Sequence, residues 1–264
     1  MAKSFTGAAF ITGASSGLGR ALAPRLAADG QPVAIAARRL SALEDLAAEI
    51  TAAGGTAQPI ALDVSDPDAV QRAVAQAEAE LGSIGLMIAN AGIDGLTPAE
   101  NFKASDVSRV LQVNLVGAAA CYEAVLPGML ERGDGQLVGV ASLAGFRGLP
   151  GAGAYCASKS GLIALLESLR IELAPRGISV TTLNPGFVKT PMTAPNQHPM
   201  PFLMELDAAA KVMHRAIRRR ASECSFPKSL ASITRTGKLL PNGLYDRILK
   251  NKKADKGGEQ TDWS

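Results

Sequence analysis

The sequence contains few of the residues that build disulfide scaffolds, metal centres or membrane-spanning segments. Its 264 residues include 3 cysteines, which cannot all pair and show no CxxC spacing, and only 2 histidines. No run of about 18 uninterrupted apolar residues occurs, and residues 1–7 lack the charged-then-apolar layout of a secretory signal. These absences predict a cytoplasmic protein with no metal site and no transmembrane segment.

Net charge is also low, and it is unevenly distributed. The 27 Lys and Arg residues and 24 Asp and Glu residues leave a net +3, too little to predict a nucleic acid as a partner. Residues 1–207 hold 14 basic and 19 acidic residues, a net −5, whereas residues 208–264 hold 13 and 5, a net +8. We expect residues 227–264 to form a basic C-terminal extension in solvent, not a separate domain. Peripheral contact with a membrane or a partner is the alternative.

Short aliphatic runs alternate with longer helical patterns along most of the chain. Such runs, separated by helices of about 10 residues or more, predict a parallel sheet covered by helices on both faces. With right-handed crossovers, the expected fold is a single α/β domain of the Rossmann type over residues 1–226, doubly wound, with about seven strands. The expected strands are 8–11, 33–36, 57–62, 86–89, 136–140, 179–183 and 223–226. The expected helices are 17–29, one that begins at Ser41 with a capping box to Glu44, 66–81, 105–130, 155–174 and 207–220.

A glycine-rich turn follows the first expected strand and reads Thr12-Gly13-Ala14-Ser15-Ser16-Gly17-Leu18-Gly19. A tight turn here lets the backbone approach a pyrophosphate, and the helix N-terminus that follows supplies free N–H groups. Glycine also ends strands for steric reasons, but the position at the first strand-to-helix turn favours nucleotide binding. The predicted cofactor contacts in this turn are Gly13, Ser15, Ser16, Gly17, Leu18 and Gly19.

The end of the second expected strand predicts which nicotinamide cofactor is used. Folds that bind NAD usually place an acidic side chain there, but the sequence has Ala37 followed by Arg38. A guanidinium can pair with the 2′-phosphate of NADP in a bidentate fork. We therefore expect NADP(H) rather than NAD(H), with a solvated pair of arginines as the alternative.

Tyr155 and Lys159 are candidates for proton transfer. Residues four apart lie on the same face of a helix, so these two side chains project to the same side. A free phenol has a pKa of about 10 and exchanges protons poorly near neutrality. A nearby ammonium favours the phenolate, so we expect Lys159 to lower the pKa of Tyr155.

Taken in order, these motifs resemble those of the short-chain dehydrogenase/reductase family over residues 5–190. The resemblance implies that Asp63, next to Val64, contacts the adenine ring. It implies that Asn90-Ala91-Gly92 lines the cofactor cleft, although Ala89 replaces the first Asn of the family's element. The segment after the sixth strand would contact the carboxamide of the cofactor, and its matching residues are Pro185, Gly186, Val188 and Thr190.

The resemblance also implies a reaction, the transfer of a hydride between nicotinamide C4 and a carbonyl or secondary alcohol. Tyr155 would be the acid or base, and Ser142 would orient the substrate oxygen. Lys159 would bind the nicotinamide ribose as well as lower the tyrosine pKa, and Asn114 would anchor a water of a proton relay. The sequence departs from the family's acyl-carrier-type reductases, because it lacks their VDGG-like segment that packs a tetramer. A homodimer through helices 105–130 and 155–174 is therefore expected.

The expected substrate is a hydrophobic small molecule, because the residues expected around Ser142 and Tyr155 are apolar. They are Ile93, Leu143, Phe146, Phe187 and Met192, and residues 190–207 lie where the family has its variable substrate lid. Two other functions remain open. The first is a non-catalytic NADP-sensing or scaffold protein, which would not need Ser142, Tyr155 and Lys159. The second is a nucleotide-sugar epimerase or dehydratase, which normally has a larger C-terminal domain than the residues after Thr190 can form.

Overall fold

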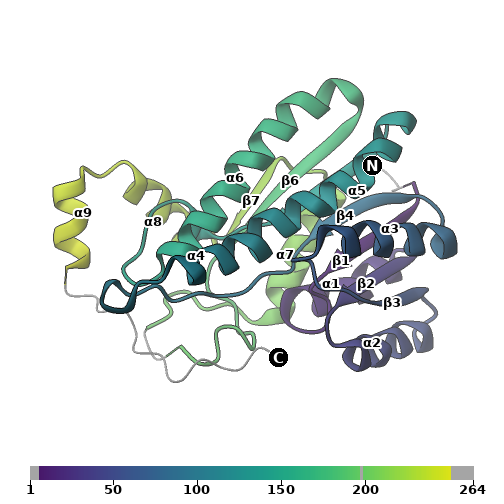
Figure 1. Cartoon of the computed structure of the whole chain (residues 1–264), viewed down its shortest axis with the longest axis horizontal. Coiled ribbons are helices and arrows are strands. Elements are labelled where there is room, and N and C mark those ends of the chain that lie inside the picture. Colours follow the sequence, from purple (N-terminus) through teal and green to yellow (C-terminus); the bar gives the residue numbers. More distant parts are fainter. Residues whose placement is uncertain (1–5, 197–198, 251–264) are drawn as a thin grey trace.

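The computed structural model of the chain describes residues 6–196 and 199–250. Within them, seven strands form one parallel sheet in the order β3-β2-β1-β4-β5-β6-β7 (Figure 1). The strands are β1 (Ala8–Thr12), β2 (Val33–Ala37), β3 (Ala57–Ala61), β4 (Ile84–Ala89), β5 (Gly135–Val140), β6 (Ile178–Pro185) and β7 (Glu223–Phe226). The doubly wound parallel sheet expected from the sequence is confirmed, and the strand order reverses between β1 and β4, where such folds bind their ligands.

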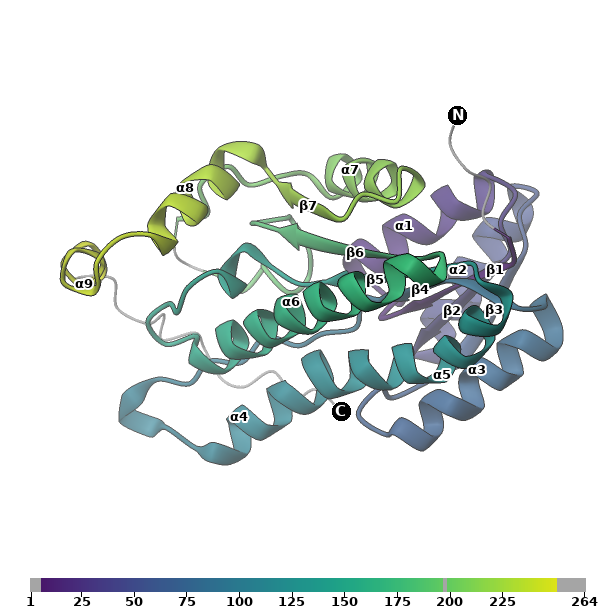
Figure 2. The same cartoon turned by 90° about the horizontal axis from the view of Figure 1, so that it is seen from above.

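Helices cover both faces of the sheet (Figure 2). They are α1 (Gly17–Ala28), α2 (Leu40–Ala52), α3 (Pro67–Leu81), α4 (Ala104–Leu111), α5 (Gly117–Arg132), α6 (Gly153–Leu173), α7 (Leu206–Arg218), α8 (Lys228–Lys238) and α9 (Asn242–Leu249). Buried side chains of α1, α2 and α7 form the core on one face, and those of α3, α5 and α6 form the core on the other. Strands β2 and β4 are buried throughout and consist almost wholly of aliphatic residues, which made them recognisable in the sequence.

The start of α2 differs from the expected capping box. The helix begins at Leu40, one residue early, and its N-cap is Arg39, whose side chain makes no capping hydrogen bond. Strand β2 ends at Ala37, so Ser41 already lies inside the first helical turn, where its hydroxyl is no longer at the capping position. The expected start of α3 is confirmed, because Asp66 Oδ1 accepts a hydrogen bond of 3.1 Å from the Ala69 N–H.

The helix expected over 105–130 is present but interrupted. A π-helical turn, Gln112–Val116, separates α4 from α5. By length and composition alone, the stretch Ala104–Arg132 could cross a membrane, contrary to the sequence expectation. Its apolar residues have another explanation, since Cys121, Val125 and Met129 are buried in the core beside the sheet.

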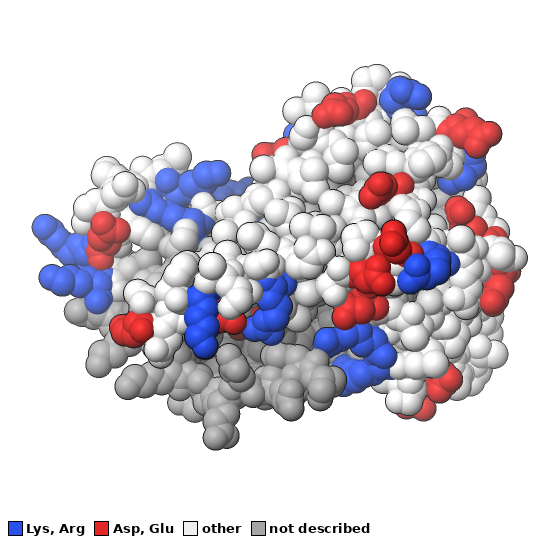
Figure 3. Space-filling view, in the orientation of Figure 1, with Lys and Arg blue, Asp and Glu red and all other residues white. Residues whose placement is uncertain are grey.

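The described part of the C-terminal extension, residues 227–250, is mostly exposed but helical. It forms α8 and α9, and Leu230 and Ala231 of α8 are buried. Lys and Arg side chains gather at the end of the molecule that carries α8 and α9 (Figure 3). Part of this basic charge is used internally, because Arg235 forms an ion pair of 2.6 Å with Glu223. The rest of the extension, from residue 251, lies outside the described residues.

Candidate active site

The glycine-rich turn lies directly against the segment that follows β4. Gly13 adopts a φ of +68°, and a Cβ there would lie 2.8 Å from the Ala91 Cα. A Cβ on Gly19 would lie 2.6 Å from Asn90 Nδ2 and 2.7 Å from the Gly13 oxygen. No side chain larger than hydrogen fits at these two positions, so glycine is needed for the turn to pack closely against the segment after β4.

The N-terminus of α1 is left without a side-chain cap. Ser16 is the N-cap residue, but its side chain makes no capping hydrogen bond, and the first turn has no acidic residue. Gly17 follows with a φ of +57°, and a Cβ there would meet only the Thr190 side chain, at 3.6 Å. Uncapped N–H groups at a helix N-terminus form an anion-binding site, so the expected pyrophosphate contacts fit this geometry.

Thr12 joins the turn to β4, and the sequence analysis did not single it out as a site residue. Its Oγ1 accepts hydrogen bonds of 3.0 Å from the N–H groups of both Asn90 and Ala91. The Asn90 amide in turn donates to the Thr12 and Gly13 carbonyls, at 2.9 and 3.2 Å. A threonine at the carboxyl end of a buried strand was the available signal. The network holds the two halves of the expected cofactor cleft together.

Two further parts of the expected cofactor site lie at the carboxyl ends of β2 and β3. Arg38 and Arg39 are both exposed, and Arg39 Nη2 donates a hydrogen bond of 3.1 Å to Ser15 Oγ in the glycine-rich turn. Asp63 is exposed as well, and its Oδ1 accepts from the N–H and the hydroxyl of Ser65, at 2.9 and 2.7 Å. Val64 is buried. Arg39, which follows the expected Arg38, thus contacts the glycine-rich turn.

The expected catalytic residues come together from three elements. Tyr155 and Lys159 lie one turn apart on α6, and the Lys159 Nζ lies 5.7 Å from the centroid of the Tyr155 ring. Ser142 follows β5, and its hydroxyl lies close enough to the Tyr155 phenol to lower the pKa of that phenol. Its hydroxyl also lies 3.4 Å from the Pro185 carbonyl at the end of β6, so the site spans the edges of β5 and β6.

Asn114 lies in the π-helical turn and is buried. Its Nδ2 donates to the Ile93 carbonyl at 2.9 Å and to Ser158 Oγ at 3.0 Å, and its Oδ1 accepts from the Ile93 N–H at 2.8 Å. A Cβ on Gly92 would lie 3.3 Å from Asn114 Oδ1 and 3.4 Å from Lys159 Nζ, so the three residues are close neighbours. Single π turns are often found at functional sites.

Comparison with known proteins agrees with this arrangement. The family described as short chain dehydrogenase matches residues 7–200. The chain belongs to the short-chain dehydrogenase family. An uncharacterized oxidoreductase of Myxococcus xanthus (strain DK1622) is 50% identical over 238 residues, which are 90% of this chain and 94% of that protein.

Other similar proteins of the family use different cofactors. The 2-dehydro-3-deoxy-L-rhamnonate dehydrogenase (NAD(+)) of Sphingomonas sp. (strain SKA58) is 41% identical, over 70% of this chain and 73% of its own length. An alcohol dehydrogenase from the archaeon Thermococcus sibiricus, solved with 5-hydroxy-NADP, superposes with a TM-score of 0.75 at 27% identity, over 83% of this chain and 95% of that chain. The chain is thus an oxidoreductase of a family that binds a nicotinamide cofactor, and its glycine-rich turn has the shape for one.

In the structure the pKa of Tyr155 is raised rather than lowered. Burial raises the pKa of Tyr155 to about 12, the Ser142 hydroxyl lowers it only in part, and the Asp94 carboxylate raises it further. Burial also lowers the pKa of Lys159 to about 8. The ammonium donates its hydrogen bond of 2.8 Å to the Val140 carbonyl, away from the phenol oxygen. At neutral pH, Tyr155 therefore holds its proton firmly and Lys159 is the group that titrates most easily.

The residues expected around the substrate divide into two groups. Leu143, Phe146 and Phe187 pack together, and they do so against Leu230 and Ala231 of α8, which the sequence analysis missed. Met192 is not part of this cluster and lies exposed in the turn after β6. The expected lid, 190–207, is fixed near its end, because Met204 pairs with residues 187 and 189 through backbone hydrogen bonds of 2.9 Å. Residues 197–198 of the lid lie outside the described residues.

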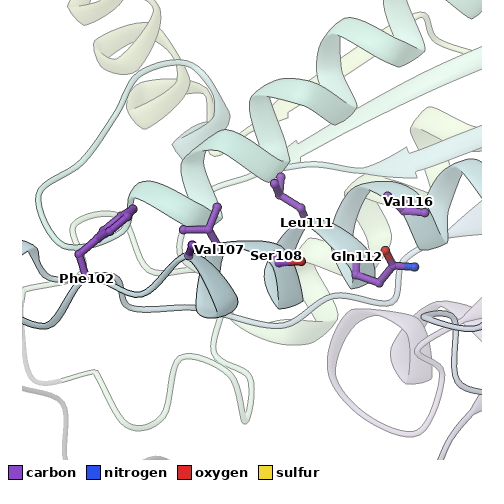
Figure 4. Close-up of a pocket in the computed structure, with 7 residues that line it drawn as sticks. Phe102, Val107, Ser108, Leu111, Gln112 and Val116 are labelled. Carbon is purple, nitrogen blue, oxygen red and sulfur yellow. The ribbon is translucent and has the colours of Figure 1, made fainter.

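A separate hollow of about 460 Å³ lies on α4 and the π-helical turn, and its lining includes none of Asn114, Ser142, Tyr155 and Lys159 (Figure 4). Its wall is mostly apolar and contains Phe102, Ala104, Val107, Ser108, Leu111, Gln112 and Val116. Phe102 and Val116 are exposed, although they are large and hydrophobic. The hollow belongs to the surface of the helices through which a dimer was expected.

Proposed function

We propose that the protein is an NADP-preferring short-chain dehydrogenase that interconverts a hydrophobic carbonyl compound and its secondary alcohol. The observation that carries the proposal is that Ser142, Tyr155 and Lys159 lie together, with the Ser142 hydroxyl close enough to lower the pKa of the phenol and the Lys159 ammonium 5.7 Å from the tyrosine ring. A bound nicotinamide ring would supply or accept the hydride. The protein supplies the hydroxyl groups that hold the substrate oxygen and exchange its proton.

Each catalytic side chain then has one task. Ser142 hydrogen-bonds the carbonyl oxygen and holds it against Tyr155, which donates its phenolic proton in reduction and takes one back in oxidation. Burial raises the pKa of this phenol to about 12, so the phenol is protonated at neutral pH and a nearby cation is needed to make it an effective acid and base. Lys159 binds the ribose hydroxyls and, with a pKa lowered to about 8, can pass on a replacement proton. The polar side-chain atoms of Asn114 are bonded to Ile93 and Ser158, so its main chain would hold the relay water.

Binding of the cofactor would use the whole carboxyl edge of the sheet. The pyrophosphate would lie on the glycine-rich turn and the start of α1, where backbone N–H groups are uncapped. Arg38, with Arg39 beside it, would pair with the 2′-phosphate, which supports a preference for NADP(H). The remaining contacts are those that the family resemblance implies: Asp63, Val64, Asn90, Ala91, Gly92, Pro185, Gly186, Val188 and Thr190.

The quaternary state and location are part of the same proposal. A homodimer through α4, α5 and α6 is supported by exposed apolar side chains along this surface: Phe102 just before α4, Val116 in the π-helical turn and Ile171 on α6. A cytoplasmic location is supported by three cysteines, Cys121, Cys156 and Cys224, that form no disulfide bond.

The test is the nicotinamide absorbance during incubation with a panel of hydrophobic ketones and secondary alcohols. We expect the wild type to turn over at least one of these compounds. Tyr155→Phe should lower the turnover rate at least 1,000-fold because it removes the acid and base, and a positioned general acid or base contributes about 10²- to 10⁴-fold. Binding of NADP(H) should be unchanged in this variant. Tyr122→Phe is the matched control, because this phenol lies in the core, 3.4 Å from the Val138 carbonyl.

Two other outcomes would replace the proposal. Tight cofactor binding with no absorbance change on any substrate would favour the non-catalytic sensor or scaffold. Conversion of nucleotide sugars with no net change in nicotinamide absorbance would favour an epimerase or dehydratase. Retention of most activity by Tyr155→Phe would contradict the role of the tyrosine itself.

A further inference from the structure

We propose that α8 and α9 form the outer wall of the substrate site and that Leu230 limits the size of the apolar group beside the substrate carbonyl. The proposal rests on the carbonyl–alcohol activity proposed above and adds the element that selects among such substrates. Helix α9 lies at one extreme end of the described molecule, away from α2 and β3 (Figure 1). The contacts of α8 nevertheless reach the residues that hold the reacting oxygen.

Leu230 packs on both strand ends that make up the site. A Cβ on Gly186 would lie 2.8 Å from Leu230 Cδ2 and 3.2 Å from Leu143 Cδ1, so the two leucines share the space above this glycine. Leu143 directly follows Ser142, and Gly186 directly follows Pro185, whose carbonyl lies 3.4 Å from the Ser142 hydroxyl. Leu230 therefore packs against Leu143 and Gly186, which follow Ser142 and Pro185 in the chain.

The surroundings of Leu230 are apolar. Leu143, Leu230 and Ala231 are buried together, and Phe146 and Phe187 pack on them while remaining partly exposed. A cationic side chain lies nearby, that of Arg235, 5.8 Å above the Phe146 ring, but it is paired with Glu223 at 2.6 Å. This wall suits a neutral aliphatic or aromatic substituent and offers no free charge to a carboxylate or phosphate on the substrate.

Arg147 holds the two helices on the loop that carries this wall. Its Nη1 donates to the Gly237 and Leu240 carbonyls at 2.5 and 2.8 Å, and its Nη2 donates to Asn242 Oδ1 at 3.0 Å. Its guanidinium also stacks on the Tyr245 ring, 3.7 Å from the centroid. These groups are the end of α8, the connection and the start of α9, so one side chain fixes all three.

A second contact comes from α9 to the same loop. The Tyr245 hydroxyl donates a hydrogen bond of 2.8 Å to the Gly148 carbonyl. Phe146, which lines the wall, is followed directly by Arg147 and Gly148, which anchor α8 and α9. The wall and the anchoring contacts therefore share one short segment of chain. Arg147 is thus a positioning residue for the wall, and Leu230 is the residue that determines specificity.

Specificity is tested with a series of methyl ketones whose second substituent grows stepwise from methyl to a bicyclic ring. The quantity compared is the kcat/KM for the largest ketone divided by the kcat/KM for the smallest. This ratio should rise about tenfold in Leu230→Val and fall by a similar factor in Leu230→Phe. A single methylene in an apolar pocket changes kcat/KM by about 10- to 200-fold. Ile233→Val is the matched control, because Ile233 lies on the same helix and is 58% exposed; its ratio should equal that of the wild type. The KM for NADPH should be unchanged in all three variants.

The outcomes separate this proposal from the proposed function. Absence of turnover by the wild type on every ketone removes both. Turnover with an unchanged size ratio in Leu230→Val and Leu230→Phe overturns the role of α8 alone. One substitution makes the side chain smaller and the other makes it larger. If one variant fails to fold, seen as a lost thermal transition, the size ratio of the other variant still tests the proposal.

The positioning role is tested with Arg147→Gln and Arg147→Lys. Both should raise the ketone KM several-fold and speed amide hydrogen exchange in residues 228–249, because an ammonium cannot reach the three acceptors that the guanidinium holds. Exchange in the strands of the sheet should not change. Arg72→Gln, a change to an exposed arginine, is the control. Unchanged exchange in α8 and α9 in Arg147→Gln would overturn the anchoring role.

Discussion

Replacement of Lys159 by methionine separates the stability of the fold from the function of the site. The ammonium is buried, with 4% of the residue exposed, and burial lowers its pKa from 10.5 to about 8. That difference corresponds to about 3 kcal/mol of unfavourable free energy for holding the charged form inside the protein. At pH 7 both the folded and the unfolded chain carry the charge, so the whole penalty is present. Between pH 8 and 10.5 the folded chain loses its proton first, and the penalty disappears.

Lys159→Met keeps a long unbranched side chain and removes the charge. Removal of the buried charge stabilises the variant by about 3 kcal/mol. This gain is partly offset because the Val140 carbonyl loses its hydrogen-bond donor at 2.8 Å, and an unsatisfied buried acceptor costs about 1–3 kcal/mol. We expect the variant at pH 7 to be as stable as the wild type or more stable by about 1 kcal/mol. Its stability relative to the wild type should then fall by about 3 kcal/mol as the pH rises from 8 to 10.5. Turnover should be lost at every pH.

The measurement is urea unfolding followed by circular dichroism at pH 7 and at pH 10. Other groups that titrate in alkali, such as Tyr155, are the same in both proteins and cancel in the difference. Lys103→Met, at an exposed position, is the control and should show no such pH dependence. A Lys159→Met variant that is destabilised by more than about 2 kcal/mol at pH 7 would refute the reasoning, as would a stability difference that does not change with pH.

Three further predictions follow from the cofactor site and the dimer. Gly19→Ala should weaken NADPH binding at least about tenfold in a fluorescence titration, because its Cβ would lie 2.6 Å from Asn90 Nδ2; Gly243→Ala, which meets nothing within 4 Å, should bind normally. Arg38→Asp should lower kcat/KM for NADPH relative to NADH by about 50-fold, the value of one charge-assisted hydrogen bond, and a wild type that already prefers NADH would contradict the assignment. Light scattering should give twice the chain mass of 27.2 kDa, and a monomer at micromolar concentration would exclude the dimer.

The fold and the cofactor turn could be predicted because their signals are local. A strand buried on both faces must be aliphatic throughout, and Val33–Ala37 or Ile84–Ala89 shows this without reference to the rest of the chain. A turn with positive φ at Gly13 and Gly17 requires glycine at those positions. Tyr155 and Lys159 are likewise related by helical spacing alone. In each case the constraint lies within a few consecutive residues, so the sequence displays it.

The features that were missed depend on three-dimensional surroundings. Helical spacing brings Lys159 near Tyr155, but burial determines the direction of both pKa changes, and burial is set by the whole fold. Thr12 gains its role only when β1 lies beside β4, and the contact of Leu230 with Leu143 joins parts of the chain that are far apart in sequence. The charge count of the C-terminal region predicted an exposed extension but not its contacts, because composition does not reveal that Arg147 holds its two helices.

The weak packing of the C-terminal helices is itself informative about substrate entry. Helix α8 buries only Leu230 and Ala231, and no residue of α9 is buried. Elements with few buried contacts open locally at a small fraction of the free energy of global unfolding. The placement of α9 then depends on the polar contacts of Arg147 and Tyr245 rather than on the hydrophobic core. In the proposed site, a wall held in this way would open at a small cost in free energy without disturbing the sheet or the catalytic side chains, which would admit a bulky apolar substrate.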